Sequence, residues 1–479
     1  MFTGKRFLVL LTLVLVLLLS ACPAFASSPV AEMGGAVYDS LQNAFDAAVP
    51  GTPATVKLLS SFQTGSSFVI EKGQDITLDM NGHSITVTSN FEGRPIFNYG
   101  TLVITGNGVI DASASDTDGY GAVDNYGVLT IENGTFTGSV NASGASIKNR
   151  PGSDLTIRDG LFNGAVTAVY NAGTARIYNG TFDCRSCSSC NPNSWGYTIQ
   201  SHEDAPGYAP SLTFYNGTVI GVQGAFSSSA GHTDIYDGSF KTVSCKNHRN
   251  GSTAFYALYV AGESGEVECN VYGGTFQSAS KVAALIGNNT QGDGGDRKAA
   301  VANFYGGTFR SGDKTTALKV DGVIGSLAIS GGSYFLSNGT PATTEVKDYL
   351  VPGFEQNPDG SVACTHASIA EMPGKAPTCT EPGSLACWHC SACGKYFSDA
   401  SLAHELSQEQ LVIPPTGHRF EDGVCTVCGA ADPGYVPPAA ALPPKTGDAT
   451  PLWLWAALLA LSGAGLIAAV SRRSPYQSR

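Results

Sequence analysis

The sequence predicts an all-β solenoid, in which short strands wind into coils that stack along one axis. The main observation is an eight-residue pattern, Leu129–Phe136, which recurs at 155–162 and 175–182. Its glycine gives a regular landmark, because Gly82, Gly108, Gly134 and Gly160 are each 26 residues apart. Later copies, which end near Gly217, Gly238, Gly274, Gly307 and Gly332, are spaced unevenly. A coil of constant length that carries loops of different length produces this spacing, which is typical of repeat folds.

One copy of the pattern explains how a coil is built. Leu129 and Ile131 are two residues apart and therefore point to the same face of a strand. Asn133 and Gly134 tolerate a positive φ, which a tight corner requires. Phe136 then begins the next strand with a large apolar side chain that we expect to point inward. The composition from about residue 55 to 353, rich in Gly, Asn, Thr, Ser and β-branched residues, fits such strands and turns throughout.

A second landmark is an asparagine that precedes the glycine by 9 to 11 residues in four successive copies. These residues are Asn98, Asn125, Asn149 and Asn171. Stacked coils would align them, so we expect a ladder of amides that hydrogen-bond to each other along the solenoid axis.

The segment Ile76–Ile85 and the Gly-Thr-Phe copies resemble the right-handed parallel β-helix proteins of the pectin-lyase-like group. The resemblance covers most of the chain after its first residues. It implies a right-handed parallel β-helix over residues 29–353. It implies no single activity, because lyases, hydrolases, adhesins and passive stalks share this fold.

The N-terminal segment 1–26 has the pattern of a secretory signal peptide, with Lys5 and Arg6 before an apolar run and a small-x-small end at 24–26. Leu19–Cys22 also resembles a bacterial lipoprotein box, so lipidation of Cys22 is an alternative. Residues 41–48 then have helical spacing after an N-cap at Asp39 or Ser40. We expect this short helix to cap the open end of the solenoid, and a partner-binding helix is the alternative.

No catalytic set is evident in the repeats. Pectate lyases carry clustered acidic calcium ligands with an arginine base, and polygalacturonases carry several aspartates with a histidine, but no comparable group stands on successive coils at one register. The best acidic cluster is the loop with Asp111, Asp116, Asp118 and Asp124, for which calcium binding is the weaker alternative to a solvated loop. Asp293 and Asp296 form a second, weaker calcium candidate. The histidines of the solenoid are expected to be surface residues.

The solenoid also contains cysteines, and they differ in character. Cys269 aligns with Leu129 in the repeat, so we expect an inward-facing, free and apolar side chain. Cys184, Cys187 and Cys190 form a run that fits either a disulfide or part of a metal site, and Cys245 stands elsewhere. An exported chain permits disulfides.

A change of composition marks a Cys-rich module at 364–429. It holds two Cys-x-x-Cys-Gly turns, at Cys390 and Cys393 and at Cys425 and Cys428, each preceded by a histidine, His366 or His418. The module resembles zinc-ribbon-like repeats of secreted Gram-positive proteins. Zinc held by the four turn cysteines, or by one turn with a histidine, is the first hypothesis, with about one ion per chain. Disulfides are the alternative. Cys364, Cys379 and Cys387 are left without an assigned partner.

The C-terminal part has, in sequence order, the elements of a membrane or cell-wall anchor. A Pro/Ala-rich linker at 430–441 precedes residues 442–479, which include an uncharged stretch at 451–470 long enough to cross a bilayer and a basic tail. This order resembles a sortase cell-wall sorting signal, which implies cleavage between Thr446 and Gly447 and transfer to peptidoglycan. Pro443 stands where that family has leucine, so a plain transmembrane anchor is the alternative.

Together these features predict an exported protein on the surface of a Gram-positive bacterium, with sortase, peptidoglycan and the membrane as partners. We expect a non-catalytic, adhesin-like or glycan-binding protein, whose ligand is an extracellular glycan or a host surface molecule. We expect no nucleic-acid partner. A polysaccharide lyase or glycoside hydrolase is the alternative, and carboxylates grouped with Arg or Lys on neighbouring coils of one flank would favour it.

Overall fold

The computed structural model describes residues 28–438, except for 90, 116–120, 140–144, 165–166, 186–195, 223, 245–255, 289–296 and 322–323. The described residues form two compact units, one with 28–371 and 388–396, the other with 372–387 and 397–438. The predicted signal peptide, Thr446, Gly447 and the apolar segment 451–470 lie outside the described residues. Asp116, Asp118, Asp293, Asp296, Cys187, Cys190 and Cys245 lie outside them as well.

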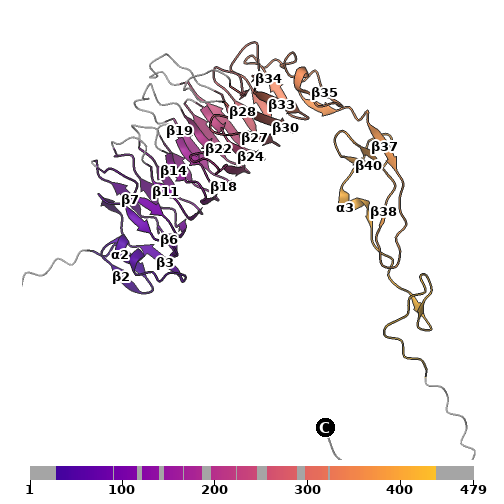
Figure 1. Cartoon of the computed structure of the whole chain (residues 1–479), viewed down its shortest axis with the longest axis horizontal. Coiled ribbons are helices and arrows are strands. Elements are labelled where there is room, and N and C mark those ends of the chain that lie inside the picture. The colour runs from indigo at the N-terminus through magenta and orange to yellow at the C-terminus, as the bar shows by residue number, and fades with distance from the viewer. Residues whose placement is uncertain are drawn as a thin grey trace, which may run out of the picture. The chain divides into compact units, whose positions relative to one another are not determined.

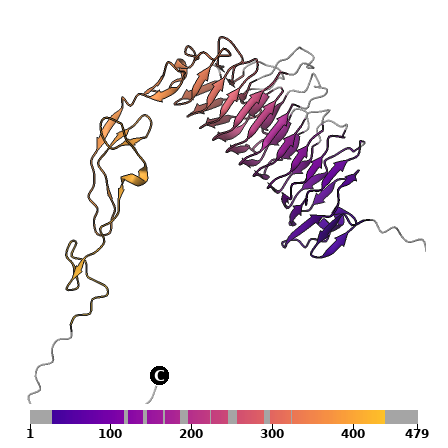
Figure 2. The ribbon, with the colours of Figure 1, turned by 180° about the vertical axis from the view of Figure 1, so that it is seen from behind.

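Three sheets run along the solenoid, and each complete coil adds one strand to each of them, so that parallel strands stack from coil to coil (Figures 1 and 2). Sheet 1 has 13 described strands: β2 (Ala36–Tyr38), β1 (Ala31–Met33), β3 (Pro53–Leu58), β6 (Asp75–Asp79), β9 (Thr101–Thr105), β12 (Val128–Ile131), β15 (Asp154–Ile157), β18 (Thr174–Ile177), β21 (Ser211–Phe214), β24 (Gly231–Ile235), β27 (Val267–Val271), β30 (Ala300–Phe304) and β33 (Gly325–Ile329).

Sheet 2 has 11 described strands: β4 (Phe62–Thr64), β7 (Ser84–Val87), β10 (Val109–Asp111), β13 (Thr135–Thr137), β16 (Leu161–Asn163), β19 (Thr181–Cys184), β22 (Thr218–Gly221), β25 (Ser239–Thr242), β28 (Thr275–Gln277), β31 (Thr308–Arg310) and β34 (Ser333–Phe335). Sheet 3 has 10 described strands: β5 (Phe68–Ile70), β8 (Ile96–Asn98), β11 (Val123–Asn125), β14 (Ala145–Asn149), β17 (Thr167–Asn171), β20 (Tyr197–Ser201), β23 (Gly224–Ser228), β26 (Leu258–Val260), β29 (Ala284–Ile286) and β32 (Leu318–Val320). The prediction of a parallel β-helix is confirmed.

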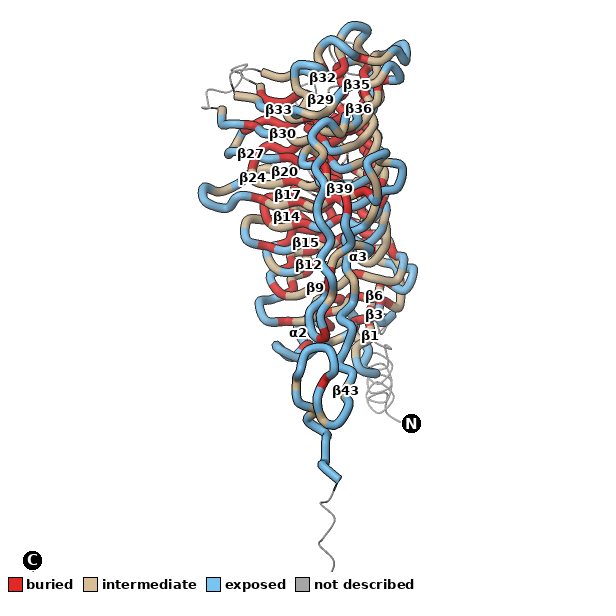
Figure 3. Tube along the Cα trace, turned by 90° about the vertical axis from the view of Figure 1, so that its right-hand side faces the viewer, coloured by how far each residue is buried: buried red, intermediate tan, exposed pale blue. Residues whose placement is uncertain are grey.

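The repeat pattern places its side chains as expected. Leu129 and Ile131 are buried and pair in register with Leu155 and Ile157 of the next coil. Buried residues lie inside the stack of coils and exposed residues follow its corners (Figure 3). Cys269 is free and fully buried in the row that contains Leu129, which confirms the expectation for it.

The corner glycine and the aromatic residue that follows it act together. Gly134 has a φ of +124°, and a Cβ added there would lie 3.2 Å from the carbonyl oxygen of Gly108 in the preceding coil. The chain can therefore turn at this point only with glycine. Phe136, Phe162 and Phe182 then stack inside the solenoid, with ring centroids 5.2 and 4.9 Å apart.

The asparagine ladder is present on sheet 3. The Nδ2 of Asn98 donates to Oδ1 of Asn125 at 2.7 Å, Asn125 donates to Asn149 at 2.7 Å, and Asn149 donates to Asn171 at 2.9 Å. All four residues are fully buried. The ladder satisfies polar groups that burial would otherwise leave without partners, and it thereby fixes the register between coils. In the next coil Ser201 takes the position of asparagine.

The N-terminal end of the solenoid is closed by the predicted cap. Helix α2 (Leu41–Asp46) begins after Ser40, whose hydroxyl accepts a hydrogen bond from the N–H of Asn43. Leu41, Ala44 and Phe45 are buried in the core cluster of the solenoid. The antiparallel pairing of β1 with β2 and β3, which extends sheet 1, was not predicted.

The C-terminal end is closed by a turn of 3-10 helix, η1 (Lys347–Tyr349), and by the antiparallel pair β35 (Phe354–Gln356) and β36 (Val362–Cys364). Val346 and Val362 belong to the buried core cluster, and the N–H of Val362 donates to the carbonyl of Gly332 in the last coil. The solenoid core therefore extends to residue 362, beyond the expected boundary at 353.

The remaining elements are short: β37 (Ile369–Met372), β38 (Gly383–Ser384), β39 (Cys387–Cys390), β40 (Tyr396–Phe397), β41 (Glu405–Leu406), α3 (Gln408–Leu411), β42 (Val412–Ile413), β43 (Phe420–Glu421) and β44 (Val424–Cys425). The module predicted at 364–429 is thus divided between the two compact units. Within residues 28–438, gaps excepted, no helix has the length and apolar character needed to cross a membrane.

The aromatic stack predicts a large effect of one truncation. Phe136→Ala should lower the free energy of unfolding by about 3–5 kcal/mol, because it removes a fully buried ring and leaves a cavity. Chemical denaturation of the full chain measures this. Val128→Ala, at an exposed position of the same coil, is the control and should change the free energy by less than about 0.5 kcal/mol. Equal effects of the two substitutions would contradict the inward position of Phe136.

Candidate metal centres and a charged cluster on the solenoid

The first group of metal-binding side chains contains Cys364, His366, Cys390 and Cys393, whose ligand atoms all lie within 4.8 Å of one another. Cys364 ends β36, and Cys390 ends β39. The Sγ atoms of Cys364 and Cys390 are 3.7 Å apart, and Sγ of Cys393 is 3.6 Å from Nδ1 of His366. We call this group site A. All of its residues belong to the unit that contains the solenoid.

The second group contains Cys379, His418, Cys425 and Cys428, again within 4.8 Å of one another. The Sγ atoms of Cys379 and Cys425 are 3.8 Å apart, and Sγ of Cys428 is 3.2 Å from Nδ1 of His418. We call this group site B. All four residues belong to the second compact unit.

The two Cys-x-x-Cys-Gly turns have the same backbone hydrogen bond, and both lower the pKa of their first cysteine. The N–H of Gly394 donates to the carbonyl of Cys390, and the N–H of Gly429 donates to that of Cys425, which closes each turn. Burial raises the pKa of the Cys390 thiol, but hydrogen bonds from the N–H of Cys393, from His366 and from other backbone groups outweigh it and lower the pKa to about 6. Hydrogen bonds from the N–H groups of Cys428 and Val427 lower the pKa of Cys425 to about 5. Both turns therefore favour the thiolate form of their first cysteine.

The distances fit a tetrahedral ion with sulfur and nitrogen ligands. With metal–sulfur bonds of about 2.3 Å and metal–nitrogen bonds of about 2.0–2.1 Å, two sulfurs lie about 3.8 Å apart and a sulfur and a nitrogen about 3.6 Å apart. Three of the four measured separations in sites A and B match these values, and the separation of Cys428 from His418 is shorter. Each site can therefore hold one metal ion through three cysteines and one histidine.

This arrangement corrects the hypothesis of a single site shared by both turns. Cys390 and Cys393 belong to one group, and Cys425 and Cys428 belong to the other. Each turn supplies two ligands to its own site. A histidine and a cysteine that precede the turn in the sequence supply the other two ligands. His366 and His418 take the positions that the second form of the hypothesis allowed. Cys364 and Cys379, which sequence reasoning left unassigned, complete the sites.

The sequence contained a signal for one of the two missing ligands. Cys364 is separated from His366 by a single residue, so both can face one ion from the end of one strand. Cys379 offered no comparable signal, since it stands 46 residues from Cys425 along the chain. Cys387 is buried and free, and it belongs to neither group.

A second constellation lies on the outer face of sheet 3. Asp124, Lys148 and Tyr170 pair in register on the successive strands β11, β14 and β17. Each of them directly precedes a ladder asparagine, so the inward asparagines place them outward. Arg94, Arg150 and Asp204 join them from neighbouring segments. We call these six residues the charged cluster.

The centre of the charged cluster is a buried carboxylate. Asp124 is 2% exposed, and its Oδ2 lies 3.0 Å from Nε of Arg94 and 2.6 Å from Nη2 of Arg150. Arg150 also donates from Nε to Oδ1 of Asp124, so this pair is bidentate. Its guanidinium lies over the ring of Tyr126, 5.1 Å from the centroid. Two guanidinium groups therefore share this one buried carboxylate.

The outer part of the charged cluster is reached by solvent. Nζ of Lys148 lies 3.3 Å from Oδ2 of Asp204, and both side chains are about a fifth exposed, at 22% and 23%. The hydroxyl of Tyr170 donates to Oδ1 of Asp204 at 2.5 Å. Burial lowers the pKa of Lys148 despite Asp204, and burial together with the bond to Asp204 raises the pKa of Tyr170. His202 packs beside Tyr170, with ring centroids 5.8 Å apart.

The charged cluster adds to what the sequence analysis found. No catalytic set was evident at one register in the repeats, and the structure shows that loops and strands of several coils bring carboxylates and cations together here. The signal was the residue before each ladder asparagine, which reads Asp, Lys and Tyr in three successive coils. Asp124 also differs from a calcium ligand, since both of its oxygens are engaged by arginines. Asp111 lies apart and accepts a hydrogen bond from the N–H of Ser113.

Sheet 1 carries a different feature, a row of five stacked tyrosines. Each tyrosine directly follows one of the strands β18, β21, β24, β27 and β30. The tyrosines are Tyr178, Tyr215, Tyr236, Tyr272 and Tyr305, with successive ring centroids 4.8, 5.3, 4.8 and 5.0 Å apart. We call this row the tyrosine ladder. Its inner members cover each other's faces, so they present ring edges and hydroxyl groups to solvent.

Comparison of the chain with models of known protein families, with curated proteins and with solved structures found no match. Function must therefore be argued from the sites themselves.

The geometry of sites A and B predicts two metal ions per chain. Elemental analysis of the full chain, purified without added chelator, should give about two zinc ions if each site takes one. Cys364→Ser and Cys428→Ser should each lower the content by about one ion, since each removes a ligand from one site. Cys387→Ser is the matched control, because this cysteine is buried but belongs to neither site. Disulfides detected by mass spectrometry at these cysteines, without metal, would contradict the prediction.

Proposed function

We propose that this protein is exported, anchored on the surface of a Gram-positive bacterium, and binds an anionic extracellular glycan along the outer face of sheet 3. The signal-peptide pattern of residues 1–26 and the sorting-signal pattern around Thr446 and Gly447 support export and anchoring. Sortase and peptidoglycan are then the partners of the C-terminal segment. The β-helix is the part that meets the ligand.

The charged cluster is the observation that carries the glycan proposal. It contains three cations and two carboxylates, although the whole chain has a net charge of −12. Arg and Lys provide charge-assisted hydrogen bonds to carboxylate or sulfate groups, and the side chains of Lys148 and Arg150 are 22% and 26% exposed. The cluster spans successive coils, so a polymer that lies along the solenoid could contact several of its residues.

Zinc is the metal that best fits the proposed role of sites A and B. Three thiolates and one imidazole form a closed tetrahedral set, which is typical of structural rather than catalytic zinc. When bound, zinc cross-links segments that are too short and too polar to form a core. Each ion would then stabilise the unit that contains it, site A at the end of the β-helix and site B in the second unit.

The enzyme alternative is a polysaccharide lyase that uses the same cluster. Lys148 has a lowered pKa, which favours a neutral amine able to accept a proton, and Tyr170 has a raised pKa, which keeps its hydroxyl protonated. A base and an acid of this kind, next to arginines that can neutralise a uronate carboxylate, are the groups that β-elimination needs. Asp204 opposes this role, because it holds both Lys148 and Tyr170 in an ion pair and a hydrogen bond. Binding without turnover is therefore our first proposal.

The binding proposal predicts that Lys148→Gln weakens binding of polygalacturonate and other anionic glycans by about tenfold or more, since one charge-assisted hydrogen bond contributes about 1.5–3 kcal/mol. Affinity electrophoresis or calorimetry with the full chain measures this. Arg158→Gln is the control, because Arg158 is an exposed cation of the same solenoid that lies outside the cluster and pairs with Glu132. Neutral glycans should bind equally to both variants. Equal losses in the two variants would contradict a site at the cluster.

Binding should also depend on pH in one direction. Burial lowers the pKa of Lys148, so this side chain loses its charge at a lower pH than an exposed lysine does. The affinity for an anionic glycan should therefore decrease as the pH rises through that lowered pKa. Calorimetry over an alkaline pH series tests this, with Lys148→Gln as the variant in which the decrease should be absent.

The lyase alternative has a separate readout. Turnover of a uronate polymer by β-elimination produces an unsaturated sugar that absorbs in the ultraviolet. Our proposal expects no such product, with or without calcium. A product that appears with the full chain and is lost in Tyr170→Phe, while binding is retained, would establish the enzyme instead.

Anchoring is tested by fractionation of cells. The protein should stay with peptidoglycan after detergent extraction and be released by a muramidase, and Thr446→Ala should move it to the membrane fraction. The control is Thr450→Ala, a threonine of the same segment that lies outside the Thr-Gly pair. Complete detergent solubility of the unmodified protein would contradict attachment to the cell wall.

A further inference from the structure

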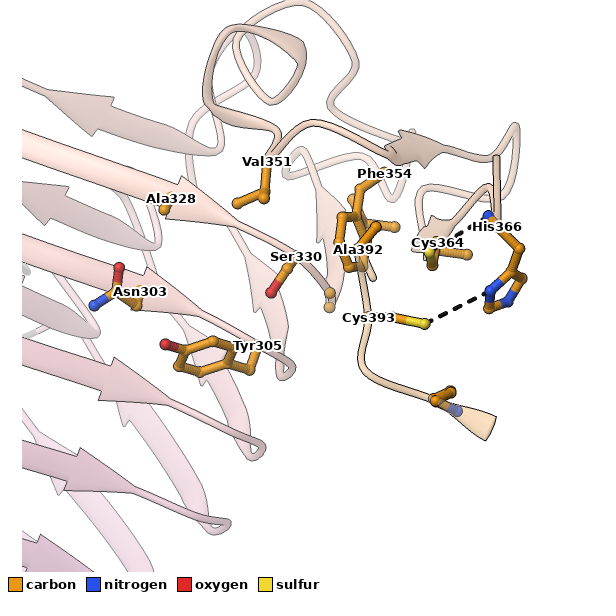
Figure 4. A pocket seen from close by; sticks show the side chains of 15 residues that line it. Asn303, Tyr305, Ala328, Ser330, Val351, Phe354, Cys364, His366, Ala392 and Cys393 are labelled. Carbon is orange, nitrogen blue, oxygen red and sulfur yellow. Dashed lines mark hydrogen bonds between the residues drawn. The ribbon is translucent and has the colours of Figure 1, made fainter. Parts of the chain in front are cut away.

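A cleft of about 820 Å³ lies at the C-terminal end of the solenoid, within the unit that holds the β-helix (Figure 4). Its floor is the end of sheet 1, with Asn303, Tyr305 and Ser330, and its opposite wall includes Phe354, His366 and Lys395. The volume falls within the range of small-molecule sites, which is about 300–1,000 Å³. The cleft is separate from the charged cluster, which lies on sheet 3.

We propose that this cleft binds a pyranose sugar, and that a metal ion in site A is required for binding. The proposal goes beyond the anionic-glycan site on sheet 3, because it concerns another sheet and another chemistry. It rests on the position of Tyr305, on the polar groups around it and on the sharing of side chains between the cleft and site A.

Tyr305 is the last member of the tyrosine ladder. At the other end of the ladder, Tyr178 stacks on Tyr215 and has the guanidinium of Arg158 5.4 Å from its ring centroid. The ring of Tyr305 stacks on Tyr272 with one face, at 5.0 Å and an interplanar angle of 11°. The next position in the same row is Ser330, which follows Ile329 as Tyr305 follows Phe304. Among the described residues no ring therefore covers its second face. Tyr305 is 50% exposed, more than any other tyrosine of the ladder.

The corner after Ser330 keeps this ring accessible. Gly331 and Gly332 line the cleft and carry no side chains. A Cβ added to Gly331 would lie 2.0 Å from the carbonyl oxygen of Tyr305, so glycine is required at this position. The floor of the cleft thus presents one flat aromatic surface beside a corner without side chains.

The chemistry of the lining matches a sugar. A pyranose ring has C–H groups on its face, which pack on an aromatic ring, and hydroxyl groups around its edge, which need hydrogen-bond partners. The Nδ2 of Asn303 donates to Oδ1 of Asn270 at 2.9 Å, so the Oδ1 of Asn303 and the Ser330 hydroxyl are the groups beside Tyr305 that can supply such partners. The cleft is lined by one lysine, Lys395, and by no aspartate or glutamate.

The opposite wall of the cleft belongs to site A. Cys364, His366 and Cys393 line the cleft and are three of the four side chains that can hold a metal ion there. Metal binding would fix the loop between β36 and β37 and the turn after β39 in one position. The wall would then be preformed for the sugar, which lowers the cost of ordering on binding. By linkage, the sugar should also increase the affinity of site A for its metal.

The test uses the full-length chain, purified in detergent with its metal. The probes are the methyl glycosides of glucose, galactose, mannose, N-acetylglucosamine and glucuronic acid, and binding is measured by saturation-transfer NMR and calorimetry. We expect at least one of these glycosides to bind. Tyr305→Ala should weaken that binding by about tenfold, because it removes the ring on which the face of the sugar packs.

The matched control is Tyr236→Ala. Tyr236 is exposed like Tyr305, but its ring is stacked on Tyr215 and on Tyr272, so it offers no free face. Sugar binding should be unchanged in this variant and in Lys148→Gln, which separates the cleft from the charged cluster. If no glycoside binds, or if Tyr305→Ala and Tyr236→Ala have equal effects, the sugar site is wrong.

The metal requirement has its own controls. Removal of the ion with a chelator should abolish sugar binding, and so should Cys390→Ser, which removes a ligand of site A that does not line the cleft. Cys379→Ser, which affects site B alone, should leave sugar binding intact. The circular dichroism of the β-helix verifies that the variants remain folded. Sugar binding that persists after chelation would overturn the role of the metal.

Discussion

Stacking of equivalent side chains along the solenoid axis is the interaction on which the rest of this structure depends. Each coil buries the same few positions, and those positions meet their own equivalents in the coils above and below. The aromatic row that includes Phe136 and Phe162 and the ladder that includes Asn125 and Asn149 are two forms of this contact. The first contributes apolar burial. The second fixes the register between successive coils, because a shift of one strand by one residue would leave buried amides without hydrogen-bond partners.

Fixed register has a consequence for the outside of the molecule. When the inward asparagines align, the residues before them align as well, on the opposite face of sheet 3. Asp124, Lys148 and Tyr170 form a row for this reason, although nothing in their own chemistry requires them to be close. Once they are aligned, charges that would repel or attract weakly in solution become partly buried partners. A fold maintained by its interior thus determines which exterior side chains can act together.

This relation explains what could be predicted from the sequence. The corner at Gly134, the inward Phe136, the amide ladder and the cap with Ser40 all depend on local spacing, and all are confirmed. The charged cluster was missed, because Arg94 and Asp204 reach it from loops whose course no local pattern gives. The metal ligands also include one that a local pattern indicates and one that no local pattern indicates. Cys364 beside His366 is a local signal, whereas Cys379 meets Cys425 only through the folding of a long intervening segment.

Stacked rows also create special positions where they end. Inside the tyrosine ladder each ring is a neighbour's partner, so Tyr236 has no face to offer to a ligand. At the last coil the same residue type has one partner and one open face, because Ser330 replaces the next tyrosine. The repeats of the solenoid end at this coil, and the antiparallel strands β35 and β36 that follow close its C-terminal end. Strand β36 ends at Cys364, which belongs to site A. The end of a repeat is therefore where a uniform surface becomes a concave one. The tyrosine ladder can therefore bind a ligand at this boundary, where a ring with one open face meets residues of a different segment.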